Sequence, residues 1–137
     1  MSLWKNMDQL EAFAALKETK KVSLQEVMAG EAGAERVKKY QIPMAEGMSY
    51  NFAAKAVDDD ILAALQQLAD EAELTEKFEE LYNGAVINTG EKRMVLHHLT
   101  RGQLGADVVA DGVNKRDFYL NEQKKIADFA NDVHSGK

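Results

Sequence analysis

The stretch that decides the fold is DDDILAALQQLAD, residues 58–70. Three aspartates come first, and an aspartate at a helix start accepts hydrogen bonds from free backbone N–H groups and complements the positive end of the helix dipole. Apolar residues then recur at helical spacing, at Ile61, Leu62, Leu65, Leu68 and Ala69. The stretch therefore predicts a helix with one apolar face, the clearest helix of the chain.

Two further helices are predicted after this stretch. The first ends at Asn83-Gly84, residue types that tolerate a left-handed helix terminus, and its apolar positions are Leu74, Phe78, Leu81 and Tyr82. The last runs over residues 114–134 and ends before Gly136, with an apolar stripe of Phe118, Ile126, Phe129, Ala130 and Val133. Between them lie an apolar cluster (Met94, Val95, Leu96 and Leu99) and a loop over 102–112 with a short extended piece at 108–109.

The residues before the deciding stretch predict shorter elements. Apolar spacing over residues 7–18 indicates a helix. Ser23 and Glu26 have the capping-box spacing, which predicts a short helix that ends near Gly30. Residues 31–40 suit another short helix, which Gly33 weakens. Pro43 and Gly47 then interrupt the helical pattern, and the alternation of Met48, Tyr50 and Phe52 with polar residues predicts a strand over 47–52.

These elements make a mainly α fold with a small extended or β component. The chain has 137 residues, the size of one domain, and 45% of them are hydrophobic. Strands and helices do not alternate in the way that would indicate a parallel sheet. We therefore expect residues 1–137 to form one helical unit.

Charge and composition exclude several classes of partner. The net charge is −6 and basic residues are interleaved with acidic ones, so no nucleic-acid-binding surface is expected. The chain has no cysteine, which excludes disulfides and thiolate chemistry. We expect no membrane partner, because no apolar stretch approaches the roughly 20 residues of a membrane span. The start of the sequence has no apolar signal core, so a cytoplasmic location is expected.

The histidines do not have the spacing of a metal site. His97 and His98 are adjacent, so on a helix they point about 100° apart, and His134 has no partner four residues away. The consecutive carboxylates Asp58, Asp59 and Asp60 diverge as well, and a role at the helix start accounts for them. We expect no metal site in the chain.

The other candidates for chemistry also lack a supporting pattern. Two glycine pairs, Gly30 with Gly33 and Gly102 with Gly105, do not match the known phosphate-binding motifs. Glu79 and Glu80 lie on a polar helix face, and no serine has the context of a nucleophile, the serines being Ser2, Ser23, Ser49 and Ser135. We therefore assign no catalytic, cofactor-binding or metal-ligating residue, and we expect no cofactor.

One stretch nevertheless carries a resemblance. Residues 87–101 read I-N-T-G-E-K-R-M-V-L-H-H-L-T-R, which resembles the segment I-N-x-T-E-x-R-A-V-L-H-x-A-L-R of glucose-6-phosphate isomerases. The matching residues are Ile87, Asn88, Glu91, Arg93, Val95, Leu96, His97 and Arg101. Gly90 replaces a threonine of that segment, Met94 replaces an alanine, and Leu99-Thr100 replaces Ala-Leu, which indicates a divergent member.

The flanking segments resemble the same family in order and spacing. Residues 78–84 resemble a helix that ends in a phenylalanine and glycine turn, and residues 109–112 resemble a V-D-G turn. Residues 126–129 with Ser135-Gly136 resemble the helix and S-G ending that precede the sugar-isomerase domain. The match of residues 50–55 to a D-Y-S-K-N-like piece is poor. The resemblance covers most of the chain from about residue 48.

The resemblance implies that this chain is the amino-terminal subdomain that precedes the α/β sugar-isomerase domains. The family continues with a glycine-rich phosphate loop, G-I-G-G-S-x-L-G-P, and Lys137 comes just before it. The family's proton-shuttling Glu, its ring-opening His and Lys, and its enediolate-stabilising Arg all come from the part that is absent here. The resemblance implies a parent enzyme that interconverts glucose 6-phosphate and fructose 6-phosphate without a cofactor, and a homodimer in full length.

The chain alone is then expected to be inactive and to contribute structure. Because His97, Arg93 and Arg101 lie beside an apolar cluster in the sequence, we expect them to be packing or hydrogen-bonding residues. Two alternatives stay open at this point. One is a free-standing helical interaction domain without enzymatic activity, and the other is a split enzyme whose second chain supplies the catalytic domains.

Overall fold

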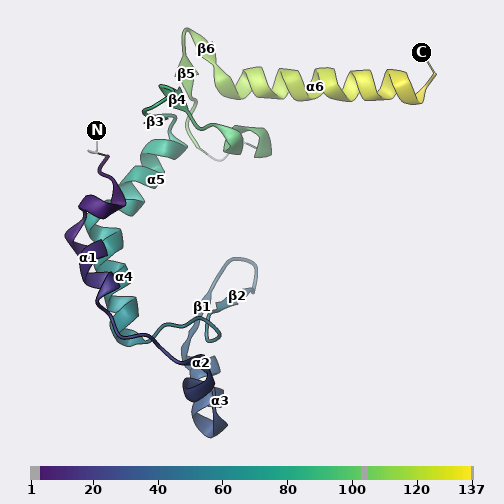
Figure 1. Ribbon diagram of the computed structural model, residues 1–137. Coiled ribbons are helices and arrows are strands. Elements are labelled where there is room, and N and C mark those ends of the chain that lie inside the picture. The colour runs from purple at the N-terminus through teal and green to yellow at the C-terminus, as the bar shows by residue number, and fades with distance from the viewer. Residues whose placement is uncertain (1–3, 103–104, 137) are drawn as a thin grey trace. The chain divides into compact units, whose positions relative to one another are not determined.

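The structure, a computed structural model, describes residues 4–102 and 105–136. It divides into two compact units, a first unit of residues 4–73 and a second unit of residues 74–136. Figure 1 labels the elements of both. Helices dominate and each sheet has two strands, so the mainly α class with a small β component is confirmed.

The first unit contains the two clearest features of the sequence, the helix after the aspartates and the strand after Pro43. Its elements are η1 (Met7–Gln9), α1 (Glu11–Lys17), α2 (Leu24–Val27), α3 (Gly30–Lys39), β1 (Gln41–Pro43), β2 (Ser49–Asn51) and α4 (Asp59–Glu71). The Asp58 side chain accepts a hydrogen bond from the Ile61 N–H at 2.9 Å, which confirms the predicted helix start.

The helix predicted over residues 7–18 is divided at Leu10, which has an extended backbone and is buried. α1 then packs against α4. The carboxylate of Glu71, near the end of α4, accepts hydrogen bonds from the N–H groups of Glu11 (3.1 Å) and Ala12 (2.7 Å). A side chain 60 residues away in sequence therefore caps α1. These N–H donors hold the pKa of Glu71 below its ordinary value, the Ala12 bond contributing most.

The capping box predicted at Ser23 is wrong in its hydrogen bonds. Ser23 does precede α2, but its side chain makes no capping bond, and α2 ends at Val27 instead of near Gly30. Gly33, expected to weaken the next helix, is instead required by packing. A Cβ at that position would lie 2.3 Å from the carbonyl oxygen of Met28, so only glycine allows α3 to approach α2 this closely.

The strand predicted over 47–52 is confirmed as β2, which pairs antiparallel with β1 in a hairpin. Ile42 lies opposite Tyr50, and the ring of Tyr50 stacks on Phe52 with centroids 5.9 Å apart. The tip residues Met44 and Met48 are exposed. A two-stranded hairpin has little stability of its own, so other elements must hold it in place.

The second unit contains the resemblance segment and the longest helix. Its elements are α5 (Leu74–Tyr82), β3 (Val86–Asn88), β4 (Arg93–Met94), η2 (His97–Arg101), β5 (Val109–Ala110), β6 (Val113–Asn114) and α6 (Lys115–His134). The hairpins β3–β4 and β5–β6 are antiparallel. The sequence predicted α5, α6 and an extended piece near β5, but it did not predict β3, β4 or β6.

The core of the second unit is small. Leu96, Leu99 and Val108 are buried together, and Met94 and Tyr119 pack against them. Gly84, at φ +82°, ends α5 as predicted, and a Cβ there would lie 2.3 Å from a methyl group of Val108. Glycine is therefore needed both for the turn and for the core.

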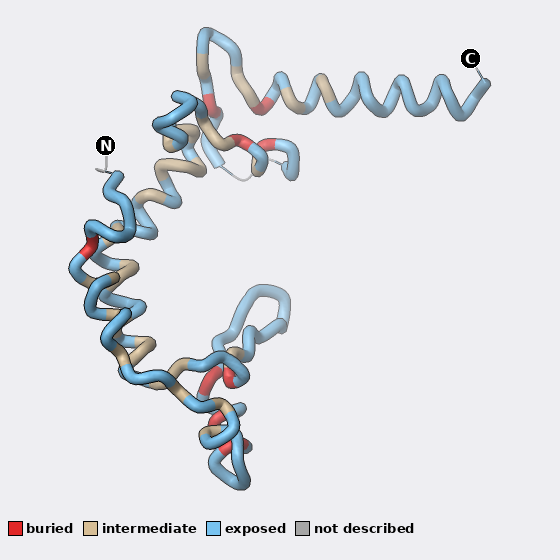
Figure 2. Tube along the Cα trace, in the orientation of Figure 1, coloured by how far each residue is buried: buried red, intermediate tan, exposed pale blue. Residues whose placement is uncertain are grey.

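α6 begins at the Asn114 cap, whose side chain accepts from the Arg116 N–H at 3.0 Å. The helix contacts η2 and β6 through its first turns. Figure 1 shows it extending past the other elements of its own unit, and Figure 2 shows that its residues beyond those turns are almost all exposed. Among the described residues, α6 and the other helices are too short or too polar to cross a membrane.

Candidate functional site

The predicted packing residues of the resemblance segment do not lie in the core. His97, Arg93 and Arg101 are all exposed in this unit, so their expected packing or hydrogen-bonding role in a longer protein stays a prediction. The segment includes the strand β4 and then a short 3₁₀ helix, whose repeat of three residues turns Leu96 and Leu99 inward and leaves His97 exposed. Arg93 makes only an exposed ion pair with Glu91, at 3.8 Å.

His98 is the histidine that packs. Its ring stacks on Tyr82 with centroids 4.5 Å apart, and its Nε2 lies 2.9 Å from the carbonyl oxygen of Tyr82. This bond fastens η2 to the end of α5, because the last carbonyls of a helix lack partners within the helix. His134, by contrast, is exposed at the end of α6.

A buried arginine, Arg36, organises the irregular chain of the first unit. Its guanidinium donates to three backbone carbonyls, those of Ala53 (2.9 Å), Lys55 (2.9 Å) and Val57 (2.6 Å). It also lies 4.3 Å from the centroid of the Tyr40 ring. The fork of N–H donors therefore holds the segment between the hairpin and α4 against α3.

A second buried arginine, Arg116, has the same role in the second unit. Its Nη1 donates to the carbonyl of Gly102 (2.8 Å) and its Nη2 to that of Ala106 (3.2 Å), so the loop is fixed to the first turn of α6. Its buried Nε has no hydrogen-bond partner among the residues that the structure describes. Arg36 and Arg116 were not identified from the sequence, because an arginine beside other charged residues reads as a surface residue.

Two charged groups with shifted pKa values, Lys39 and Asp59, lie together at the start of α4. Lys39 and Tyr40 both donate to the carboxylate of Asp59, Tyr40 at 3.0 Å. The bond from Lys39 lowers the pKa of Asp59 most, and the bond to Asp59 raises the pKa of Lys39. Lys39 and Asp59 are exposed, so their contact has the character of a surface ion pair and not of an acid–base site.

The remaining candidates have structural positions. The carbonyl of Gly102 faces Arg116, so this backbone presents an acceptor where a phosphate would need a donor. Gln103 and Leu104, within the Gly102–Gly105 pair, lie outside the described residues, as does Ser2. The Ser135 hydroxyl donates to the Asp132 carbonyl at 3.0 Å, and Ser49 begins β2.

The carboxylates of α5 surround a shallow hollow at the end of that helix. Glu76, Glu79 and Glu80 line it together with Asn83 and Gly84. Acidic side chains and the negative end of a helix dipole repel a phosphate group. The hollow is therefore unsuited to a sugar phosphate. Over residues 4–102 and 105–136, no three His, Asp or Glu side chains are grouped so that they could hold a metal ion.

The most extensive candidate surface is apolar. Few hydrophobic residues are buried, namely Leu10, Tyr40, Ala53, Leu96, Leu99 and Val108. Many large ones are exposed, including Ile42, Met44, Met48, Leu74, Phe78, Phe118, Ile126, Phe129 and Val133. Leu74 and Phe78 are each 60% exposed on α5. Residues of this kind lie on both units, so each unit presents large apolar side chains to its surroundings.

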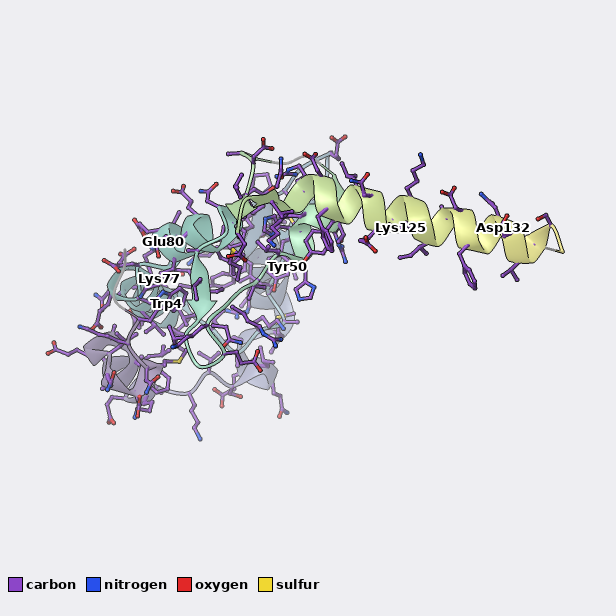
Figure 3. The ribbon with its side chains drawn as sticks, turned by 90° about the horizontal axis from the view of Figure 1, so that it is seen from above. Trp4, Tyr50, Lys77, Glu80, Lys125 and Asp132 are labelled. Carbon is purple, nitrogen blue, oxygen red and sulfur yellow. The ribbon has the colours of Figure 1, made fainter. Side chains whose placement is uncertain are left out.

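The side chains of α6 show the same property. Figure 3 shows that those beyond the first turns, with Lys125 and Asp132 labelled among them, project away from the rest of the second unit. Ile126 is 68%, Phe129 72% and Val133 58% exposed. The stripe predicted for this helix is therefore present, but the described residues of its unit do not cover it.

The comparisons with known proteins agree with one another. The family model described as phosphoglucose isomerase matches residues 51–137. The chain is 53% identical over 139 residues to the glucose-6-phosphate isomerase of Treponema denticola, a match that covers 98% of this chain and 26% of that protein. It is 44% identical to the glucose-6-phosphate isomerase of Treponema pallidum over 97% of this chain and 26% of that one.

A solved structure is also similar. The crystal structure of a glucose-6-phosphate isomerase from Chlamydia trachomatis matches with a TM-score of 0.69 at 30% identity, over 91% of this chain and 25% of that one. The chain thus spans about a quarter of the length of the relatives it matches.

Proposed function

The chain belongs to the phosphoglucose isomerase family, and on this premise we propose that it is the amino-terminal, structural part of a glucose-6-phosphate isomerase. The parent enzyme would interconvert glucose 6-phosphate and fructose 6-phosphate in glycolysis and gluconeogenesis, in the cytoplasm and as a homodimer. The 137-residue chain alone would be inactive, because the catalytic domains lie in the remaining sequence.

The observation that carries this proposal is the excess of exposed over buried apolar side chains in a chain that spans a quarter of its relatives. An independent domain of this size buries most of its large hydrophobic side chains in its own core. The exposed residues of α5, Leu74 and Phe78, and those of the hairpin tip, Met44 and Met48, suit packing against further domains of the parent enzyme.

The chemistry of the reaction supports the same division. Aldose–ketose isomerisation needs a general base that moves a proton between neighbouring carbons, and a cation that stabilises the enediolate. The two buried arginines donate to backbone carbonyls and are not available to a substrate. The hollow at the end of α5 is acidic, so a doubly charged phosphate ester would be repelled there.

The test is a coupled assay for conversion of fructose 6-phosphate to glucose 6-phosphate. It is run on the 137-residue chain and on a protein extended through the native reading frame. We expect activity in the extended protein alone. A Phe78→Glu substitution in the extended protein should lower its melting temperature, because it places a charge in the proposed packing surface, while Lys38→Glu on exposed α3 serves as the control.

Activity in the 137-residue chain would contradict the proposal. A reading frame that stops after Lys137, with no activity in the 137-residue chain, would favour the free-standing interaction domain instead. Activity that appears only when a second, separately encoded chain is added would identify a split enzyme.

A further inference from the structure

The end of α5 combines an exposed asparagine with a glycine that the fold requires. Asn83 is exposed and lines the shallow hollow at the end of the helix. Within residues 4–102 and 105–136 its side chain makes no hydrogen bond. Gly84 follows in the left-handed region, and the absence of a Cβ there makes room for Val108. The packing therefore fixes Gly84 as glycine, whereas no contact of the described residues depends on the Asn83 amide.

The turn around Gly84 ends the helix through two hydrogen bonds. The N–H of Gly84 donates to the carbonyl of Leu81 (3.1 Å), and the N–H of Ala85 donates to the carbonyl of Glu80 (2.9 Å). This is the pattern of a Schellman motif. Helix ends open more readily than helix interiors, so the Gly84 nitrogen is released from its bond at intervals. Because glycine has no side chain, nothing on Gly84 shields this nitrogen from the side chain before it.

We propose that Asn83 is a site of spontaneous deamidation. The backbone nitrogen of Gly84 forms a bond with Cγ of Asn83, the bond from Cγ to the side-chain nitrogen breaks, and that nitrogen leaves as ammonia with the proton of the Gly84 N–H. The product is a succinimide ring. Water then hydrolyses either carbonyl of the ring and leaves aspartate or isoaspartate at position 83. Water is the co-reactant, and no atom is oxidised or reduced.

The other asparagines of the chain lack this combination. The dipeptide Asn-Gly occurs once in the sequence. Hydrogen bonds engage the side chains of Asn51, Asn88 and Asn114. Asn121 and Asn131 lie inside α6, where the helical backbone opposes closure of the ring. The reaction is therefore expected to select Asn83.

The isoaspartate product acts on the core of the second unit. It moves the side-chain methylene of residue 83 into the backbone, so the chain lengthens between α5 and Gly84. The two hydrogen bonds of the turn then lose their register. Gly84 is also displaced against Val108, which is 4% exposed and belongs to the core. A displacement at this contact loosens a core that has few other members.

The aspartate product has a smaller effect. It keeps the length of the backbone but adds a carboxylate at the negative end of the helix dipole, beside the acidic hollow that Glu79 lines. Both products therefore lower the stability of the second unit, and isoaspartate lowers it more. This inference does not rest on the proposed function, because the reaction needs only the turn that ends α5.

The experiment incubates the 137-residue chain at mildly alkaline pH, which favours loss of the amide proton. Released ammonia, the masses of the peptides and enzymatic methylation of isoaspartate are followed over time. We expect ammonia release together with the mass change of an amide-to-acid exchange at position 83. Asn88 is the internal control and should react at least about tenfold more slowly, because the β-branched Thr89 crowds the attacking nitrogen. Asp111-Gly112 can form the same ring but releases no ammonia, so ammonia assigns the reaction to asparagine.

Two variants separate the reaction from its products. Asn83→Gln keeps an amide but needs a larger ring, so modification at this position should slow at least about tenfold. Asn83→Asp adds the carboxylate without lengthening the backbone. Amide hydrogen exchange at Leu96, Leu99 and Val108 should be fastest in the aged parent chain, slower in fresh Asn83→Asp, and unchanged by ageing in Asn83→Gln. Exchange in α4, which belongs to the first unit, is the control and should not change.

Three results would overturn the proposal. They are an Asn83 that reacts no faster than Asn88, an ammonia release that Asn83→Gln leaves unchanged, and a chain modified at position 83 whose core amides exchange as in the fresh chain. The assay of the proposed function uses freshly prepared protein, so its outcome is separate from all three.

Discussion

The first and second units each bury one arginine, and the two arginines differ in how completely they are bonded. Arg36 donates to three carbonyls and packs over Tyr40, whereas Arg116 donates to two carbonyls and its Nε has no partner within residues 4–102 and 105–136. Both fix irregular backbone against the side of a helix. In a chain with so small a core, a buried guanidinium can do what apolar packing does elsewhere, because one side chain satisfies several buried carbonyls at once.

The largest effect is expected at Arg36. Arg36→Ala should lower the free energy of unfolding by about 3 kcal/mol or more. The substitution leaves three backbone carbonyls without their charged donor and removes the packing on Tyr40. Denaturant unfolding measures this loss of stability in the first unit. The fluorescence of Trp4, the one tryptophan of the sequence, reports the unfolding. Lys38→Ala, at an exposed position of the same helix, is the control and should change stability by less than about 0.5 kcal/mol. If Arg36→Ala lowered the free energy of unfolding no more than Lys38→Ala does, the three hydrogen bonds would contribute little to stability.

Arg116→Ala should cost less, about 2 kcal/mol, because two carbonyls lose a donor and an unsatisfied buried Nε is removed at the same time. Amide hydrogen exchange in the first turns of α6 measures the effect locally. Arg101→Ala, which changes an exposed arginine of the same unit, provides the comparison. If Arg116→Ala proved as costly as Arg36→Ala, the number of carbonyl bonds would not explain the difference between the units.

The cap of α4 provides a smaller effect in the first unit. Asp58→Ala removes the acceptor for the Ile61 N–H, and loss of such a cap costs about 1 kcal/mol. Thermal unfolding of the variant checks this value. Asp60→Ala, in the first turn but without the capping bond, should have a smaller effect, and an equal effect would assign the stabilisation to charge near the helix dipole instead of to the cap.

The smallest effect is the pH dependence at Glu71. Its pKa is lowered in the folded chain by the Ala12 and Glu11 N–H donors, so its contribution is present above the ordinary pKa of 4.5 and is lost as the pH falls through the folded pKa. Glu71→Gln should lower the melting temperature at pH 7, and the difference from the parent chain should shrink below about pH 4. Glu18→Gln, at an exposed position of the same unit, is the control. A difference that stays constant with pH would exclude a role for the carboxylate charge.

The sequence predicted the long helices better than it predicted which side chains contact one another. α4, α5 and α6 were predicted with nearly correct ends, because aspartate caps, terminal glycines and a helical apolar repeat are local signals. The hairpin β3–β4 was missed, since its strands are too short to show alternation. The exposure of His97 and the contacts of His98 were missed, because the inward positions depend on a 3₁₀ turn.

The family could also be predicted from the sequence, because residues 87–101 and their flanks resemble glucose-6-phosphate isomerases. The comparisons confirm that resemblance. The absence of catalytic, cofactor and metal residues in this chain stays a prediction, which the assay of the extended protein tests.

The sequence by itself determined the fold class, the family and the main limits of the long helices α4, α5 and α6, because each depends on residues that are near one another in the chain. Only the tertiary structure decided which charged residues are structural. Glu71 caps a helix 60 residues away, and Arg36 reaches carbonyls up to 21 residues away. A charged side chain has no local signal that distinguishes a partner across the fold from solvent, so its role depends on how the backbone brings that partner within bonding distance.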